Sequence, residues 1–182
     1  MSVMTTLPHG RGLTVDDIEA MPDDGNRYEL LDGVLVVSPA PTPRHQRVVI
    51  NLATALQSVV PSHLWVMVAP LDVVMGPRTW VEPDVLVASK TDFDDKRLPV
   101  PPLLAIEVLS PSSALTDLNV KFEHYRGAGI PSYWVVDPVE FRLIAWELRD
   151  GDYVEVADVR GDESWTASQP FAVEIVPSAL VD

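Results

Sequence analysis

The sequence predicts an α/β protein with a mixed β-sheet flanked by helices. Segments of helical periodicity alternate with short runs rich in Val, Leu and Ile, in the core order helix, three strands, helix, strand. The 182 residues, of which 47% are hydrophobic, are enough for one domain with a sizeable core. We therefore expect a single domain over residues 1–182.

Two short elements precede this core. Thr14, followed by acidic residues and closed by Pro22, predicts a helix over residues 14–21, because Thr is a good N-cap and acids favour the first turn. The pair Asp32-Gly33 separates the runs 28–31 and 34–37, which predicts an N-terminal β-hairpin with a tight primed turn.

The first core helix is predicted from Pro43 to about Val59, with Thr42 as N-cap. Three predicted strands follow it, at residues 64–75, 81–88 and 103–110. The inward-facing stripe of the helix comprises His45, Val49, Leu52, Leu56 and Val59.

The last core elements are a helix over residues 117–128, ended by Gly129, and a strand over residues 132–137. From Phe141 onward, apolar and polar residues alternate on both sides of Asp150-Gly151. This pattern predicts C-terminal antiparallel strands and a short tail.

Composition excludes several classes of site and partner. The chain has no cysteine, so disulfides, thiolate zinc sites and cysteine nucleophiles are excluded, and the cytoplasm is the expected location. We expect neither a signal peptide nor a membrane span. Gly-rich phosphate loops, nucleophile elbows and His-Glu-x-x-His sequences are absent. The net charge of −14 opposes nucleic-acid binding, unless a local basic groove exists.

A pair of carboxylates within apolar runs is the main functional signal. Asp84 and Glu107 lie in the second and third predicted strands, where a buried ionised group is costly unless it is paired or binds a metal. Because side chains alternate along a strand, the two carboxylates can converge if these strands are neighbours. Two carboxylates with a backbone carbonyl and water make a hard oxygen site, which suits Mg²⁺ or Mn²⁺.

Lys121 follows this pair on the second core helix. Asp117, Lys121 and Tyr125 are spaced by four residues, so they fall on roughly one helix face. Lys121 can orient a nucleophilic water or stabilise charge on phosphate, while Tyr125 donates a hydrogen bond. Glu29 of the hairpin is a further candidate acid, for the metal or for positioning Lys121.

These residues together resemble the Uma-two family, a group of restriction-endonuclease-like proteins in the PD-(D/E)XK nuclease superfamily. The resemblance extends over about residues 14 to 175. It is carried by residues 28–33, the helix opening at His45, residues 82–85 and 105–112, Lys121 with Tyr125, and residues 129–138.

The resemblance implies a restriction-endonuclease-like core in which Asp84 and Glu107 bind the divalent metal. The superfamily pattern has a lysine two residues after the second acid, whereas this chain has Leu109. Similar families carry this lysine on the next helix, and Lys121 is the matching candidate. The expected activity is Mg²⁺-dependent (or Mn²⁺-dependent) hydrolysis of DNA phosphodiester bonds.

Each candidate also has a structural interpretation. Asp84 and Glu107 can form a buried ion-pair network, Lys121 can pair with Asp117, and Glu29 can brace the hairpin against Arg27. Tyr125 can serve packing alone. His45 can be a satisfied buried histidine, or an accessory ligand or base.

Three functional hypotheses remain open from the sequence. The first is the endonuclease, and the second is a catalytically inactive binding or oligomerisation module built on the same fold. The third is a paired-carboxylate glycosidase, which needs an open cleft lined by aromatic residues such as Trp65, Trp80, Trp134 and Trp146.

The expected partners are DNA and a second copy of the chain. Exposed sheet edges and the apolar tail over residues 171–176 favour a homodimer.

Overall fold

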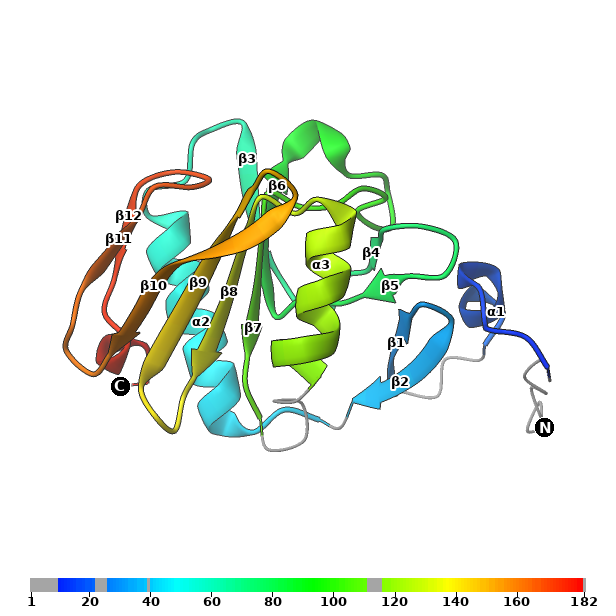
Figure 1. Ribbon diagram of the computed structural model, residues 1–182, viewed down its shortest axis with the longest axis horizontal. Helices are drawn as coiled ribbons and strands as arrows, with labels where there is room; N and C mark the ends of the chain where they lie inside the picture. Colours follow the sequence, from blue (N-terminus) through cyan, green and yellow to red (C-terminus); the bar gives the residue numbers. More distant parts are fainter. Residues whose placement is uncertain (1–9, 22–25, 39, 111–115, 182) are drawn as a thin grey trace.

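The computed structural model describes residues 10–21, 26–38, 40–110 and 116–181. It is an α/β fold with a six-stranded mixed sheet, a four-stranded antiparallel sheet and a C-terminal two-stranded sheet (Figure 1). Pro22 and residues 111–112, which entered the sequence predictions, lie outside the described residues. Within the described part of the chain, no helix is long and apolar enough to cross a membrane.

The six-stranded sheet has the strand order β10-β9-β8-β7-β6-β3. Only β7 and β8 pair in parallel, because the helix between them carries the chain back across the sheet. The predicted core order is confirmed, since α2, β3, β6, β7, α3 and β8 follow one another around this sheet. The sheet strands are β3 (Leu64–Val68), β6 (Val85–Ser89), β7 (Leu104–Val108), β8 (Ser132–Asp137), β9 (Arg142–Arg149) and β10 (Asp152–Arg160).

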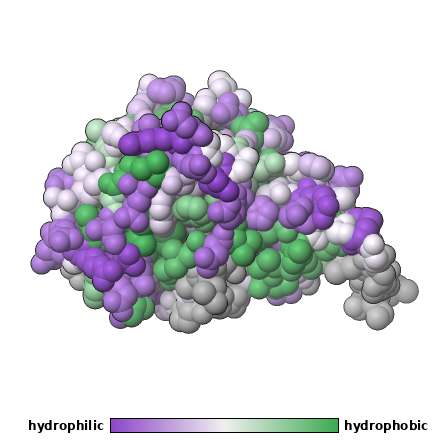
Figure 2. Space-filling model, viewed as in Figure 1, coloured by the Kyte–Doolittle hydropathy of each residue, from purple (hydrophilic) through white to green (hydrophobic). Residues whose placement is uncertain are grey.

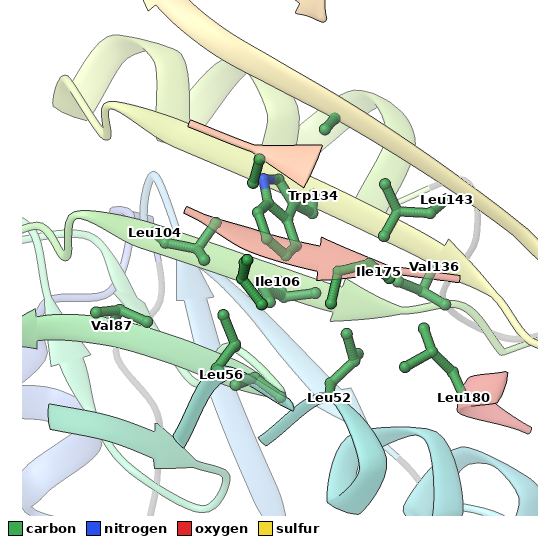
Figure 3. Packing of buried hydrophobic residues seen from close by; sticks show 14 of the residues in the cluster. Leu52, Leu56, Val87, Leu104, Ile106, Trp134, Val136, Leu143, Ile175 and Leu180 are labelled. Atoms are coloured by element: carbon green, nitrogen blue, oxygen red, sulfur yellow. The ribbon is translucent and has the colours of Figure 1, made fainter. Parts of the chain in front are cut away.

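Helices α2 (Pro43–Gln57) and α3 (Phe122–Ala128) cover opposite faces of this sheet. Period-two alternation along β7 divides its side chains between them: Ile106 packs on the α2 side and Ala105 on the α3 side. Figure 3 shows Leu52 and Leu56 of α2 in the hydrophobic cluster on the α2 side of the sheet, where they pack with residues of β7 and β8. The sheet is therefore buried on both faces around β7, the strand that carries Glu107.

The start of α2 follows its predicted chemistry. The Thr42 hydroxyl accepts a hydrogen bond from the His45 N–H at 3.2 Å, and Pro43 occupies the first turn. His45 begins the buried face, as predicted. Val59 was wrongly placed on this face: the helix ends at Gln57, and Val59 is 49% exposed.

The four-stranded sheet has the order β2-β1-β5-β4 and lies beside the central sheet. Its first two strands are the predicted hairpin, in which Asp32 and Gly33 both have positive φ, as a primed turn requires. The predicted N-terminal helix is confirmed in shorter form as α1, with Thr14 at its N-cap. The bounds are α1 Val15–Glu19, β1 Arg27–Leu31, β2 Val34–Ser38, β4 Val73–Val74 and β5 Trp80–Val81.

Two predicted strands are longer than the strands in the structure. The run 64–75 is divided into β3 and β4, and the run 81–88 is divided between β5 and β6. Pro70 and Pro83 lie in the two gaps, and a proline has no N–H to donate to a sheet. As a result, Asp84 lies immediately before β6 rather than inside a strand.

The predicted helix over residues 117–128 is confirmed as helical, but its first part differs from an α-helix. Residues Thr116–Lys121 (η2) form a wider π-helical turn, and α3 begins only at Phe122. Gly129 ends α3 with a φ of 81°, a left-handed conformation that glycine adopts without strain. A short 3₁₀ helix, η1 (Lys90–Asp92), follows β6.

The C-terminal part contains the predicted antiparallel pair, β9 and β10, joined at Asp150-Gly151. One argument for the homodimer, an exposed apolar tail over residues 171–176, is wrong. Phe171, Val173 and Ile175 are at most 9% exposed and pack into the core cluster on the α2 side, so this tail is not an exposed apolar surface. It forms β11 (Trp165–Ala167), β12 (Val173–Ile175) and the 3₁₀ helix η3 (Ser178–Leu180).

Candidate active site

Four elements meet at one end of the central sheet. The end of β7, the start of α2, the start of α3 with η2, and the β1–β2 hairpin lie together at the lower edge of the view in Figure 1. The antiparallel register pairs Val85 with Ile106, so one step further Asp84 faces Glu107. The Val108 N–H donates to Asp84 Oδ2 at 2.8 Å, which fixes this carboxylate against the end of β7.

Asp84, Arg27 and His45 form what we call the Asp84 half of the site. His45 Nε2 lies 3.1 Å from Asp84 Oδ2, and Arg27 Nη1 lies 3.5 Å from Asp84 Oδ1. Burial alone raises the pKa of Asp84, but His45, the Val108 N–H and Arg27 outweigh it and lower this pKa below its usual value. Asp84 therefore carries its charge although it is only 5% exposed.

Glu107, Lys121, Glu29 and Tyr125 form the Glu107 half. Lys121 Nζ lies 3.0 Å from Glu107 Oε1 and 2.9 Å from Glu29 Oε1. The Tyr125 hydroxyl donates to Glu107 Oε1 at 2.6 Å. The two carboxylates on Lys121 compensate the burial of its ammonium group, which leaves the residue only 3% exposed.

The structure thus brings together the residues proposed from the sequence, and it decides between some of their alternatives. The side chain of Asp117 is outside the described residues, whereas Lys121 pairs with Glu107 and Glu29. Glu29 pairs with Lys121 and also accepts from the Glu82 N–H at 2.9 Å, so it joins η2 to the segment that follows β5. Tyr125 both packs in the core and donates to Glu107.

Two charged residues at the site, Arg27 and Glu82, were not predicted as site residues, although Arg27 was considered as a partner of Glu29. Arg27 Nε lies 2.7 Å from Glu82 Oε2, and Arg27 also donates to the Glu82 carbonyl. Burial raises the pKa of Glu82, and Arg27 only partly opposes this. A signal was present in the sequence: Arg27 and Glu29 are two residues apart in β1, and Glu82 and Asp84 are two residues apart in the run that was predicted as one strand.

The chemistry of the donors fits a hard divalent cation. Asp84 and Glu107 supply carboxylate oxygens at the same strand ends, and Mg²⁺ typically takes one or two carboxylates and keeps several waters. Across the described residues, no group of three or more His, Cys, Asp or Glu side chains is arranged to hold a metal ion. A metal here would therefore depend on these two carboxylates, with backbone oxygen and water completing its coordination.

The tryptophans do not form the open aromatic cleft that a glycosidase requires. Trp134 is fully buried and packs edge-to-face on Trp165 within the core, and Trp80 is only 9% exposed. Trp65 is exposed, but it lies on β3 against Phe93. This geometry gives the glycosidase hypothesis no support.

Comparison with known proteins identifies the chain's relatives. Residues 15–179 match the model of the Uma-two (Uma2) family, whose description is "Putative restriction endonuclease". None of the curated proteins matches the sequence.

A similar solved structure is the crystal structure of a protein described as "a putative nuclease belonging to DUF820 from Anabaena variabilis ATCC 29413". The superposition has a TM-score of 0.76 and covers 93% of this chain and 97% of that one, at 18% sequence identity. This match confirms the predicted nuclease-like fold.

Proposed function

The chain belongs to the Uma-two family of restriction-endonuclease-like proteins, and from that premise we propose that it is a Mg²⁺- or Mn²⁺-dependent endonuclease that hydrolyses DNA phosphodiester bonds. The observation that carries the proposal is the cluster of buried carboxylates at the end of the central sheet. Four carboxylates, Glu29, Glu82, Asp84 and Glu107, are each at most 7% exposed. They pair with two basic side chains, Arg27 and Lys121. The acids thus outnumber their arginine and lysine partners, and the two at the strand ends, Asp84 and Glu107, supply the oxygen donors that a divalent cation needs.

Asp84 and Glu107 would hold this cation. When bound, it lowers the pKa of a coordinated water and neutralises charge that develops on phosphate oxygens. The Val108 N–H and His45 keep Asp84 in place for this role, because both bind its Oδ2 atom. The other carboxylate oxygen of Asp84 faces Arg27 at 3.5 Å.

Lys121 would act beside the metal ligands rather than bind the metal. Its ammonium group, held by Glu29 and Glu107, can donate to the attacking water or to a phosphate oxygen. Glu29 acts through Lys121 and is therefore a positioning residue. In this proposal Lys121, which lies on η2 before α3, takes the role of the lysine that the superfamily places two residues after the second acid.

A plasmid-nicking assay tests the proposal. The wild-type protein is incubated with supercoiled DNA in Mg²⁺, in Mn²⁺ and in EDTA, beside Asp84→Asn and Glu107→Gln. We expect cleavage by the wild type in either metal, none in EDTA, and a loss of at least about 10³-fold in each variant, since each removes a metal ligand.

Glu147→Gln is the matched control. Glu147 is also a buried acid, 7% exposed, but it pairs with Arg149 and Ser168 away from the site. Its variant should cleave like the wild type. Equal cleavage by Asp84→Asn and the wild type would point to a contaminating nuclease and contradict the proposal.

The alternative function is a catalytically inactive binding or oligomerisation module. The observation that favours it is that the acids of the site already have cationic partners. Lys121 forms an ion pair with Glu107, and Arg27 forms ion pairs with Glu82 and Asp84. Thermal unfolding with increasing Mn²⁺ separates the two. A metal site stabilises the protein by about 2.7 kcal/mol at one hundred times Kd, and Glu107→Gln should abolish this gain. An unfolding temperature that does not respond to Mn²⁺ favours the inactive module.

We also propose that the protein acts in the cytoplasm as a homodimer. Support for the dimer comes from β2 and β3, which end their sheets and contain no charged residue. Val34 and Val37 of β2 are 65% and 53% exposed, and Figure 2 shows apolar surface over this hairpin. Light scattering after gel filtration gives the mass. A monomer at micromolar concentration would contradict this part of the proposal.

A further inference from the structure

The charge of helix α2 differs from that of the chain as a whole. The sequence has 27 acidic and 13 basic residues, but α2 contains two arginines, Arg44 and Arg47, and no acid. Both arginines are exposed, and a spacing of three residues places them on neighbouring positions of one helix face. The start of α2 is thus a local positive surface on a strongly acidic protein.

This positive surface adjoins the Asp84 half of the site. His45 lies between the two arginines in sequence, and its Nε2 is 3.1 Å from Asp84 Oδ2. The two arginines therefore lie in the first turns of a helix that begins at the site. The positive end of the α2 dipole adds to their charge there. Arg27, with 24% of its side chain exposed, contributes a third cation on the same half.

His45 gives a second and independent indication of a ligand. Its side chain is only 9% exposed, and its Nδ1 atom is buried without a hydrogen-bond partner among the described residues. Buried polar atoms in folded proteins almost always have a partner. When both ring nitrogens carry a proton, Nδ1 can donate the missing hydrogen bond to an anion or a water while Nε2 donates to Asp84.

The Glu107 half offers no comparable surface. Its cation, Lys121, is buried between two carboxylates. The exposed acid of the following turn, Glu123, pairs with Arg126. Among the described residues around the site, the exposed arginines of α2 therefore offer a polyanion its most accessible positive charge.

We propose that Arg44 and Arg47 bind the phosphate backbone of a polynucleotide and hold it across the Asp84 half of the site. This inference rests on the proposed function, because it concerns the substrate of the same site. It also answers the objection from net charge, because the two arginines that engage the backbone lie on one face of a helix that contains no acidic residue. Phosphate contacts of this kind position the strand without reading its sequence.

Fluorescence anisotropy with a fluorescein-labelled 20-base-pair DNA duplex tests the inference. Affinity is measured at several NaCl concentrations, in EDTA, for the wild type and for Arg44→Ala/Arg47→Ala. We expect Kd to rise on the order of 10-fold at low salt. The slope of log K against log salt should fall by about 1.8, which corresponds to two lost phosphate contacts. Arg44→Glu/Arg47→Glu should weaken binding further.

Lys90→Ala/Lys96→Ala is the matched control. It also removes two cations from exposed positions, but these lie after β6, away from the start of α2. Both double variants alter exposed side chains, and their unfolding temperatures should match that of the wild type. The control should keep the wild-type Kd and salt slope.

The outcomes separate this inference from the proposed function. Wild-type protein that cleaves plasmid in Mg²⁺, with an unchanged Kd and salt slope in Arg44→Ala/Arg47→Ala, overturns the inference and leaves the nuclease proposal standing. An equal loss in the lysine control also overturns it. Wild-type protein that neither binds the duplex nor cleaves plasmid overturns both.

Discussion

The two halves of the candidate site hold their carboxylates in different ways. Asp84 precedes β6 and is fixed by a backbone N–H and by His45, while its charged neighbour Arg27 is partly exposed. Glu107 lies within β7 and shares a buried lysine with Glu29. Arg27, beside Asp84, has 24% of its side chain exposed, whereas Lys121, beside Glu107, has 4%. We infer that the substrate approaches from the Asp84 half, while the Glu107 half holds Lys121 beside the metal ligands.

The largest effect on stability is expected from removing Lys121, the buried cation of the Glu107 half. Lys121→Met leaves Glu29 and Glu107 buried without their shared partner, which should lower the free energy of unfolding by about 3–5 kcal/mol. Arg27→Met should cost less, because water reaches its partly exposed side chain. Urea unfolding measures both. A larger loss of stability for Arg27→Met than for Lys121→Met would contradict this comparison. Lys96→Met, at an exposed position, is the control for the effect of removing a lysine charge.

A smaller effect is expected from the partner of Asp84. His45→Ala removes the ring that contacts Asp84 Oδ2 at 3.1 Å, but the Val108 N–H remains. Loss of such a supporting contact typically costs about 10–100-fold in metal affinity. Calorimetric titration with Mn²⁺ measures this. An unchanged affinity would mean that the backbone alone positions Asp84.

The smallest effect is expected at Tyr125. Tyr125→Phe removes one donor from Glu107 Oε1, but Lys121 still binds this atom, so the loss of stability should be about 1 kcal/mol. Burial, with the charges of Glu107 and Glu29, holds the pKa of Tyr125 well above its usual value. The phenol therefore stays protonated, and the difference between wild type and variant should be constant from pH 6 to pH 9.

Above the ordinary tyrosine pKa of about 10, the contribution of Tyr125 to stability depends on pH. The unfolded phenol then loses its proton while the folded one keeps it, so the stability contributed by Tyr125 declines as pH rises further. Unfolding curves at pH 7, 9 and 11 check this. A difference that grows with pH would contradict the assigned direction.

The sequence predicted the parts of the site that depend on local periodicity. Two acids in apolar runs, each on a definable strand face, indicated that Asp84 and Glu107 would converge, and the register of β6 and β7 places them opposite each other. The start of α2 could also be predicted from neighbouring residues, since Thr42, Pro43 and His45 follow helix-capping rules.

Contacts that depend on packing could not be derived in this way. Arg27 and Glu82 meet because β1 pairs with β5, which Glu82 follows, and Glu29 of β1 reaches Lys121 of η2. Such pairings depend on how the elements pack and not on spacing along the chain. The divided strands were detectable, because Pro70 and Pro83 cannot donate within a sheet.

Anomalous diffraction from a crystal soaked in Mn²⁺ tests the central claim most directly. We predict one ion bound by carboxylate oxygens of both Asp84 and Glu107, with Lys121 beside it and still paired with Glu29. Asp84→Asn crystals soaked in the same way should show a much weaker peak. A wild-type crystal without an ion at these carboxylates, in which Lys121 alone occupies Glu107, would contradict the account.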